Sequence, residues 1–211
     1  MKWILIFLFC LFCENSLAFA QWDVSDFSVL GQGCEIEKKT VDESKLTLKF
    51  SHFSADLNLN GRTGSDESDC TVSVRFKVPP RRKLSALTHR VFALANKNEK
   101  SEIELNVALS LDSNSYGLRG ILPAGSSFND LVLLYKSFDI SRLYECLDEP
   151  QYVDVQLKWV LKVAALLPGA RASLNLSGED LWVDSWIATT DCELSNAFAG
   201  PNDGFRRTAL L

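Results

Sequence analysis

Two tryptophans near the end of the sequence flank an aspartate at a spacing that suits ligand binding. Trp182, Asp184 and Trp186 occupy every second position, and the apolar residues Leu181, Val183 and Ile187 occupy alternate positions. Side chains two residues apart share one face of a β-strand, so we expect all three on the same face. An indole offers a flat apolar surface and an N–H donor, and a carboxylate accepts hydrogen bonds. Facing outward, this set is suited to stacking on sugar rings. Facing inward, its N–H groups need partners inside the protein.

Catalytic chemistry has little support in the sequence, and we assign no catalytic residue. The chain holds two histidines, His52 and His89, and no G-x-S-x-G turn that would expose a nucleophilic serine. Both histidines are expected to be ordinary surface or core-edge residues. Paired carboxylates can hydrolyse glycosidic bonds, and the chain has many, such as Asp148, Glu149 and Asp184. Nothing in the sequence brings two of them across a cleft, so an acid-only polysaccharide hydrolase is kept only as an alternative.

The first twenty residues resemble a cleavable secretory signal. Lys2 is followed by an apolar run over residues 3–12 and then by the small-residue pattern Ala18-Phe19-Ala20. The run is too short to span a bilayer, which needs about 20 apolar residues. We predict cleavage after Ala20, a mature chain without a membrane span, and a secreted, periplasmic or extracellular location.

Four cysteines remain after this leader: Cys34, Cys70, Cys146 and Cys192. An even number of cysteines in an exported protein predicts two disulfides. Three pairings are possible, and the sequence alone does not choose between them. Joining near neighbours along the chain favours Cys34–Cys70 and Cys146–Cys192. No C-x-x-C pair is present among these four cysteines, which argues against a zinc site, and we expect no cofactor.

The net negative charge of the chain limits the partners that it can bind. The chain has a net charge of −5, and its one short basic run, residues 81–83, follows two prolines. Such a chain is a poor binder of nucleic acids, so we expect no nucleic-acid partner. The densest acidic cluster, residues 64–69, lacks the spacing of a calcium-binding EF-hand loop and is predicted to be a solvated turn.

The segments that would position the candidate residues are predicted to be β-strands. Apolar and polar residues alternate in the segments 46–50, 72–78, 103–111 and 153–163, and turn-forming residues separate them. The segment 84–95 fits either a helix or a strand, and its β-branched and aromatic residues favour a strand. Residues 131–135 form a plain apolar run typical of a fully buried strand, with a helical turn as the alternative. We predict an all-β, disulfide-stabilised antiparallel β-sandwich, jelly-roll-like or Ig-like, over residues 21–195, and a flexible tail over 196–211.

The order of the motifs resembles a known family. Gly31-Gln32-Gly33-Cys34 is similar to its G-x-G-C opening, and Cys70 begins an alternating strand that ends at Pro79. Cys146 precedes a long alternating strand, and Val183-Asp184-Ser185 lies in the closing one. Together these motifs resemble the secreted four-cysteine domain of unknown function 4360, over about residues 27 to 192. The chain departs from the family at Pro80-Arg81-Arg82, where the family tends to place glycine and an aromatic residue. The resemblance implies export and a β-fold, and it implies no activity.

The sequence therefore favours a non-enzymatic binding module for a glycan or a cell-wall surface, with Trp182, Asp184 and Trp186 as the candidate binding residues. A structural or interaction protein of the envelope or the extracellular space is the main alternative. In that case the two tryptophans would belong to the core.

Overall fold

The computed structural model describes residues 21–31, 33–42, 44–58 and 63–192. The expected leader over 1–20 and tail over 196–211 lie outside these residues. Within them every regular element is a β-strand, and no helix is long and apolar enough to cross a membrane.

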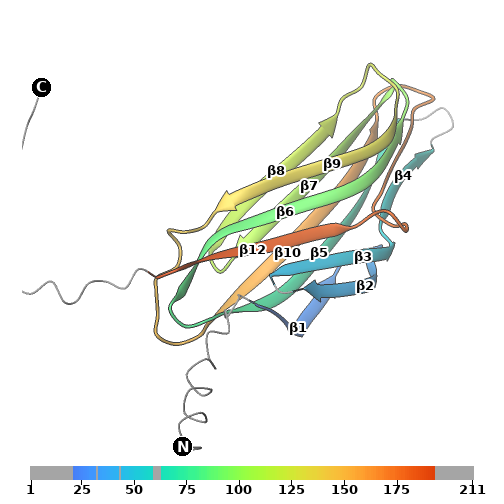
Figure 1. Cartoon of the computed structure of the whole chain (residues 1–211). Coiled ribbons are helices and arrows are strands. Elements are labelled where there is room, and N and C mark those ends of the chain that lie inside the picture. The colour runs from blue at the N-terminus through green and yellow to red at the C-terminus, as the bar shows by residue number, and fades with distance from the viewer. Residues whose placement is uncertain (1–20, 32, 43, 59–62, 193–211) are drawn as a thin grey trace, which may run out of the picture.

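Twelve strands form two antiparallel sheets that pack face to face (Figure 1). Sheet A contains, in spatial order, β1 (Gln21–Leu30), β5 (Gly64–Val78), β10 (Gln151–Ala165), β7 (Ser101–Leu111) and β8 (Asn114–Leu122). Sheet B contains β2 (Glu35–Asp42), β3 (Lys45–His52), β12 (Val183–Asp191), β6 (Arg82–Lys97), β11 (Arg171–Asn175), β4 (Ser54–Asn58) and β9 (Phe128–Asp139). The predicted all-β sandwich is confirmed, and the segment 84–95 is a strand within β6.

The connectivity is that of a jelly roll. On one side of β6, β12 pairs with residues 82–91 and β11 with residues 94–97, whereas β9 pairs with the other side. β3 and β4 likewise follow each other and pair with β12 and β11. The main strand order is therefore β3/β4–β11/β12–β6–β9 in sheet B and β5–β10–β7–β8 in sheet A. From β4 to β11 the chain changes sheet at every connection except the β7–β8 hairpin, so the fold is the jelly-roll form of the sandwich.

The core lies between the sheets and is built from the alternating positions. Inward residues of β5, β7 and β10 are buried without exception from Cys70, Ile103 and Val153 onward, and their neighbours in sequence face solvent. Trp159 is fully buried and contacts Phe50 edge-on, at 5.9 Å between ring centroids. Large apolar side chains buried in this way contribute about 2–3 kcal/mol each. The alternation of apolar and polar residues therefore determines which face of each strand packs against the opposite sheet.

Two disulfides join segments that are far apart in the sequence. Cys34 is bonded to Cys70, and Cys146 to Cys192. Both favoured pairings are confirmed. Gly31 lets the chain approach β5 beside the first bond: a Cβ there would overlap the Asp69 carbonyl oxygen, and its φ of 140° disfavours other residues. The spacing of the G-x-G-C motif therefore has a local steric reason.

Two local expectations were wrong. The acidic residues 64–69 are not a turn but the first part of β5, paired with β10. Polar side chains are tolerated on its inner face because β4 satisfies them: Asp66 accepts the Asp56 backbone N–H at 2.8 Å, and Ser68 donates to the Ser54 carbonyl at 2.5 Å. The apolar run 131–135 is a strand, but it lies at the edge of sheet B and is partly exposed rather than buried.

Candidate functional site

The structure brings the three predicted binding residues together on the outer face of sheet B. Trp182 precedes β12, and Asp184 and Trp186 lie on it, while Val183 and Ile187 point into the core. Asp184 pairs across the strands with Arg90 of β6 on one side and Thr47 of β3 on the other. Both indoles are half-buried.

Asp184 is fully buried and fully engaged. Its carboxylate accepts hydrogen bonds from Arg90 at 2.6 Å, from the Thr47 hydroxyl at 2.7 Å and from the Trp182 indole at 2.9 Å, and the Lys45 ammonium lies 3.3 Å away. Burial alone would raise the pKa of Asp184, but these hydrogen bonds and the Lys45 charge outweigh burial and lower the pKa. The carboxylate is therefore ionised at neutral pH and has no oxygen left for a ligand.

Rings and cations stack around this buried carboxylate. The Arg90 guanidinium lies 4.6 Å from the Trp186 ring centre and 4.9 Å from the Phe92 ring centre. The Trp182 ring packs on Phe92, at 4.4 Å between centroids. Each indole thus has one face covered by a neighbour. Part of the sugar-stacking surface expected from the sequence is therefore occupied within the protein, and both indoles stay half-exposed.

His89, beneath the cluster on the inner face of β6, is a core residue and not a surface one. Its Nδ1 lies 2.8 Å from the Ser185 Oγ, and its Nε2 accepts the Trp159 indole N–H at 3.0 Å. Burial lowers its pKa to about 3, although the charge of Asp184 opposes this shift. Because Nε2 is an acceptor, the neutral ring carries its proton on Nδ1 and donates it to Ser185. The pair is buried and has the wrong tautomer to activate a serine nucleophile.

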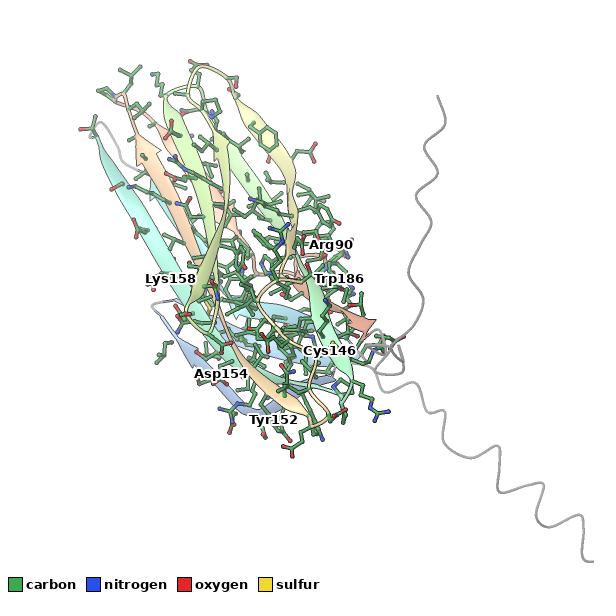
Figure 2. All side chains as sticks on the ribbon, turned by 90° about the vertical axis from the view of Figure 1, so that its left-hand side faces the viewer. Arg90, Cys146, Tyr152, Asp154, Lys158 and Trp186 are labelled. Carbon is green, nitrogen blue, oxygen red and sulfur yellow. A yellow bond between two sulfur atoms is a disulfide. The ribbon has the colours of Figure 1, made fainter. Side chains whose placement is uncertain are left out.

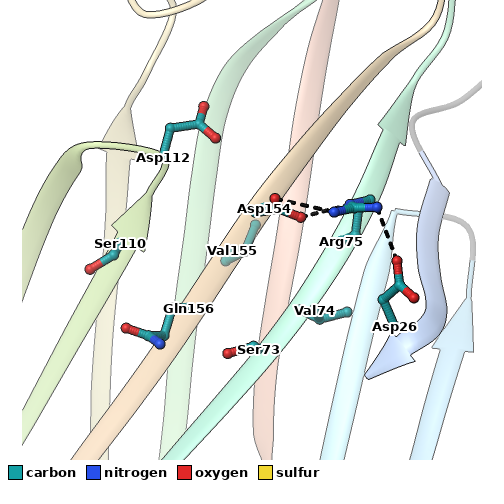
Figure 3. Close-up of a pocket in the computed structure, with 9 residues that line it drawn as sticks. All are labelled: Asp26, Ser73, Val74, Arg75, Ser110, Asp112, Asp154, Val155 and Gln156. Carbon is teal, nitrogen blue, oxygen red and sulfur yellow. Dashed lines mark hydrogen bonds and ion pairs between the residues drawn. The ribbon is translucent and has the colours of Figure 1, made fainter. Parts of the chain in front are cut away.

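A different set of polar residues lines a hollow on the outer face of sheet A (Figure 3). Ser73, Gln156 and Ser110 form one row across β5, β10 and β7, because Gln156 is paired with Ser73 on one side and with Ser110 on the other. The hollow has a volume of about 360 Å³. Within the described part of the chain these three side chains have no hydrogen-bond partner. They are free donors and acceptors in a concave site.

A charged row borders the hollow. Arg75 donates to Asp154 from Nε at 2.7 Å and from Nη2 at 3.3 Å, and its Nη1 bonds Asp26 at 3.0 Å. The hydrogen bond from Arg75 lowers the pKa of Asp154. Asp112, at the end of β7, accepts the Tyr144 hydroxyl at 2.8 Å. Asp154 is thus held as a carboxylate, which suits an orienting group and not a general acid.

The same face of sheet A has further polar and aromatic groups beyond this hollow. A second depression of about 220 Å³ is lined by Lys158, Ala108, Gly117 and Arg119, among others, and nothing occupies the space where a Cβ of Gly117 would lie. At the other end, Tyr152 is exposed on β10. Figure 2 shows Tyr152, Asp154 and Lys158 along one side of the sandwich, and Arg90 and Trp186 on the opposite side. We call these two shallow depressions, together with the exposed Tyr152 ring on the same strand β10, the groove of sheet A.

Sequence reasoning did not find this groove. Ser73, Ser110 and Gln156 are outward polar positions in alternating strands, and such positions are common in a sequence of this kind. They meet only because of the strand order β5–β10–β7, which brings together residues 73, 110 and 156. Trp22 lies in the core against Phe76 and takes no part in either outer face.

Comparisons with known proteins give only distant structural likeness. No protein-family model matches the chain, and no curated protein matches it. Among solved structures, TmCBM61 in complex with β-1,4-galactotriose is 8% identical with a TM-score of 0.31, covering 79% of this chain and 90% of that one. A CBM4 structure is 8% identical with a TM-score of 0.21, covering 80% and 91%. CBM35 from Cellvibrio japonicus Abf62 is 11% identical with a TM-score of 0.20, covering 79% and 97%. Likeness at this level supports no inference about a ligand, and the resemblance to domain of unknown function 4360 stays a prediction.

Proposed function

We propose that this chain is an exported, non-enzymatic glycan-binding module, and that the groove on the outer face of sheet A holds the glycan. The observation that carries the proposal is the row of Ser73, Gln156 and Ser110, which have no hydrogen-bond partner in the described residues and line a hollow. Sugars present hydroxyl groups that both donate and accept, and hydroxyl and amide side chains do the same.

The neighbouring groups suit the same ligand class. Asp154 and Asp112 are acceptors at one border, Lys158 is a donor further along, and Tyr152 offers an exposed ring. The groove is open and extends along the strands, which fits a chain-like ligand better than a small compact one. Two disulfides agree with a protein that works in an oxidising compartment.

An acid-only hydrolase fits this face less well. Glycoside hydrolysis needs one carboxyl group that is protonated at the working pH. Arg75 lowers the pKa of Asp154, and a like effect of Arg90 keeps Asp184 ionised on the other face. Neither group is therefore suited to protonating a leaving group.

A glycan array and a pulldown with insoluble cell-wall polysaccharides test the proposal on the chain recovered after export. Gln156→Ala should weaken binding about three- to tenfold, because one uncharged hydrogen-bonding group is lost. Lys49→Ala, on the outer face of sheet B, is the matched control and should bind like the wild type. Absence of any glycan binding contradicts the function. Binding that depends on Trp182 and Trp186 but not on Gln156 contradicts this site and favours the one on sheet B.

A further inference from the structure

β9 leaves sheet B with a long unpaired edge. It pairs with β6 from Phe128 to Asp139, and among the described residues no strand is hydrogen-bonded to its other side. Figure 1 shows β9, in yellow, as the last strand beyond β6. Natural proteins usually protect such edges with charges, prolines, bulges or short strands. The middle of β9, residues 131–135, is apolar and regularly paired, and has none of these features.

The direction of the backbone groups on this edge follows from the neighbouring pair. The Phe92 N–H of β6 bonds the Trp182 carbonyl, so Phe92 directs its backbone groups toward β12 and the residues on either side of it direct theirs toward β9. Phe92 is opposite Leu133. In an antiparallel ladder, Leu133 and the residues two positions away therefore point their backbone groups away from β6. In agreement, the Leu131 N–H bonds its neighbour Asp130 at 2.8 Å and not β6.

Apolar side chains lie along the same edge. The exposed fractions of Leu131, Leu133 and Tyr135 are 52%, 55% and 59%, and Leu94 of β6 continues the patch at 42%. The three residues of β9 share the outer face of sheet B. A partner that adds a strand to this edge would cover the outward backbone groups and these side chains together, and would replace the Asp130 side chain at the Leu131 N–H.

The sequence of β9 is self-complementary about Leu133. When two copies of β9 are placed antiparallel with Leu133 opposite Leu133, Leu131 faces Tyr135 of the second copy and Asp130 faces its Lys136. The two-fold axis repeats both pairs, giving two apolar and two opposite-charge contacts. We propose that the chain forms a two-fold dimer through antiparallel pairing of β9 with β9 of a second copy, which continues sheet B across the axis.

Sedimentation equilibrium of the exported chain over a range of concentrations tests the dimer directly. We expect a reversible monomer–dimer equilibrium. Leu133→Lys should abolish the dimer, because it places two like charges opposite each other on the axis. Leu167→Lys is the control, since Leu167 has a similar exposed fraction of 56% and lies outside β9. A wild type that stays monomeric, or a dimer unaffected by Leu133→Lys, would overturn the proposal.

A charge exchange tests the register. Asp130→Lys should weaken the dimer about tenfold or more, because each of two cross-strand pairs changes from attraction to repulsion. Combining it with Lys136→Asp restores opposite charges at both pairs and should return the dissociation constant to near that of the wild type. Lys136 also donates to the Gly117 carbonyl within its own chain, so Lys136→Asp alone should weaken the dimer as well. A double variant no tighter than the single variants would exclude this register.

Discussion

Acidification should destabilise this protein through His89, well above the range in which carboxylates titrate. The imidazole is buried between Ser185 and Trp159, and both of its nitrogen atoms are already engaged. A second proton on the ring would have to displace the Trp159 N–H from Nε2. Burial accordingly lowers the pKa of His89 from 6.5 to about 3, with the charge of Asp184 opposing the shift in part.

The size of the effect follows from proton linkage. The folded-state pKa lies below that of the unfolded chain, so the unfolded chain gains its proton near pH 6.5 and the folded protein does not. The full stability is present above pH 6.5 and falls by about 1.4 kcal/mol for each pH unit below it. Between pH 7.5 and pH 5 the loss is about 2 kcal/mol. This figure depends little on the folded-state pKa as long as that value stays below 4.5.

Urea unfolding followed by tryptophan fluorescence at pH 7.5, 6 and 5 measures this loss. His89→Gln should be less stable at pH 7.5, because it disturbs two buried hydrogen bonds, but its stability should be nearly constant down to pH 5. His52→Gln is the matched control, since His52 is the second histidine of the chain and is exposed. It should keep the wild-type slope. A wild type equally stable at pH 7.5 and 5, or the same slope in His89→Gln, would refute the reasoning.

Two further predictions concern buried charges. Asp184→Asn should lower the free energy of unfolding by about 3 kcal/mol, which is at the lower end for a broken buried ion pair because Arg90 and Lys45 are about a third exposed. The control is Asp154→Asn, which changes an exposed carboxylate and should have little effect. Equal losses in the two variants would argue against this account. Lys97→Met should cost about 2 kcal/mol, because the buried ammonium donates to the carbonyls of Ser101 and Ser126. Ser126 lies in the loop between β8 and β9, where the Gly125 N–H donates to the Glu99 carbonyl at 2.8 Å. Hydrogen exchange at the Gly125 amide should become faster in Lys97→Met, and unchanged exchange would show that Lys97 does not hold this loop.

Much of the fold was predictable because its strands alternate cleanly. The inward residues of 72–78, 103–111 and 153–163 are apolar, and the structure buries all of them. The two local predictions that were wrong concern segments in which the hydropathy pattern does not show which residues face the core. Residues 64–69 lack apolar inward positions because the backbone of β4 satisfies Asp66 and Ser68. Residues 131–135 are apolar on both faces, and only the strand order shows that they lie at an edge.

The sequence predicted which residues of the candidate site on sheet B share a face, but it did not predict their partners. Period two correctly placed Trp182, Asp184 and Trp186 on one face. It could not identify Arg90, which is 94 residues from Asp184 in sequence and meets it only through the register of β12 with β6. Whether a polar group is free for a ligand depends on such partners. These partners come together only in the assembled sheet, so they cannot be predicted from a local sequence pattern.

The two outer faces of the sandwich differ in whether their polar side chains already have hydrogen-bond partners within the protein. On sheet B the Asp184 carboxylate is engaged by Thr47, Arg90 and Trp182 and offers no acceptor to a polar ligand, although the buried Arg90 Nε has no hydrogen-bond partner in the described residues. On sheet A, Ser73, Ser110 and Gln156 remain uncommitted among the described residues, and that face keeps its capacity. Antiparallel pairing of β9 about a two-fold axis perpendicular to the sheet would turn the outer faces of sheet A in both copies to the same side. Two grooves would then face one polymer surface, and linked binding of this kind raises the overall affinity without any new contact. The proposed dimer would therefore let two shallow grooves bind one extended glycan at the same time.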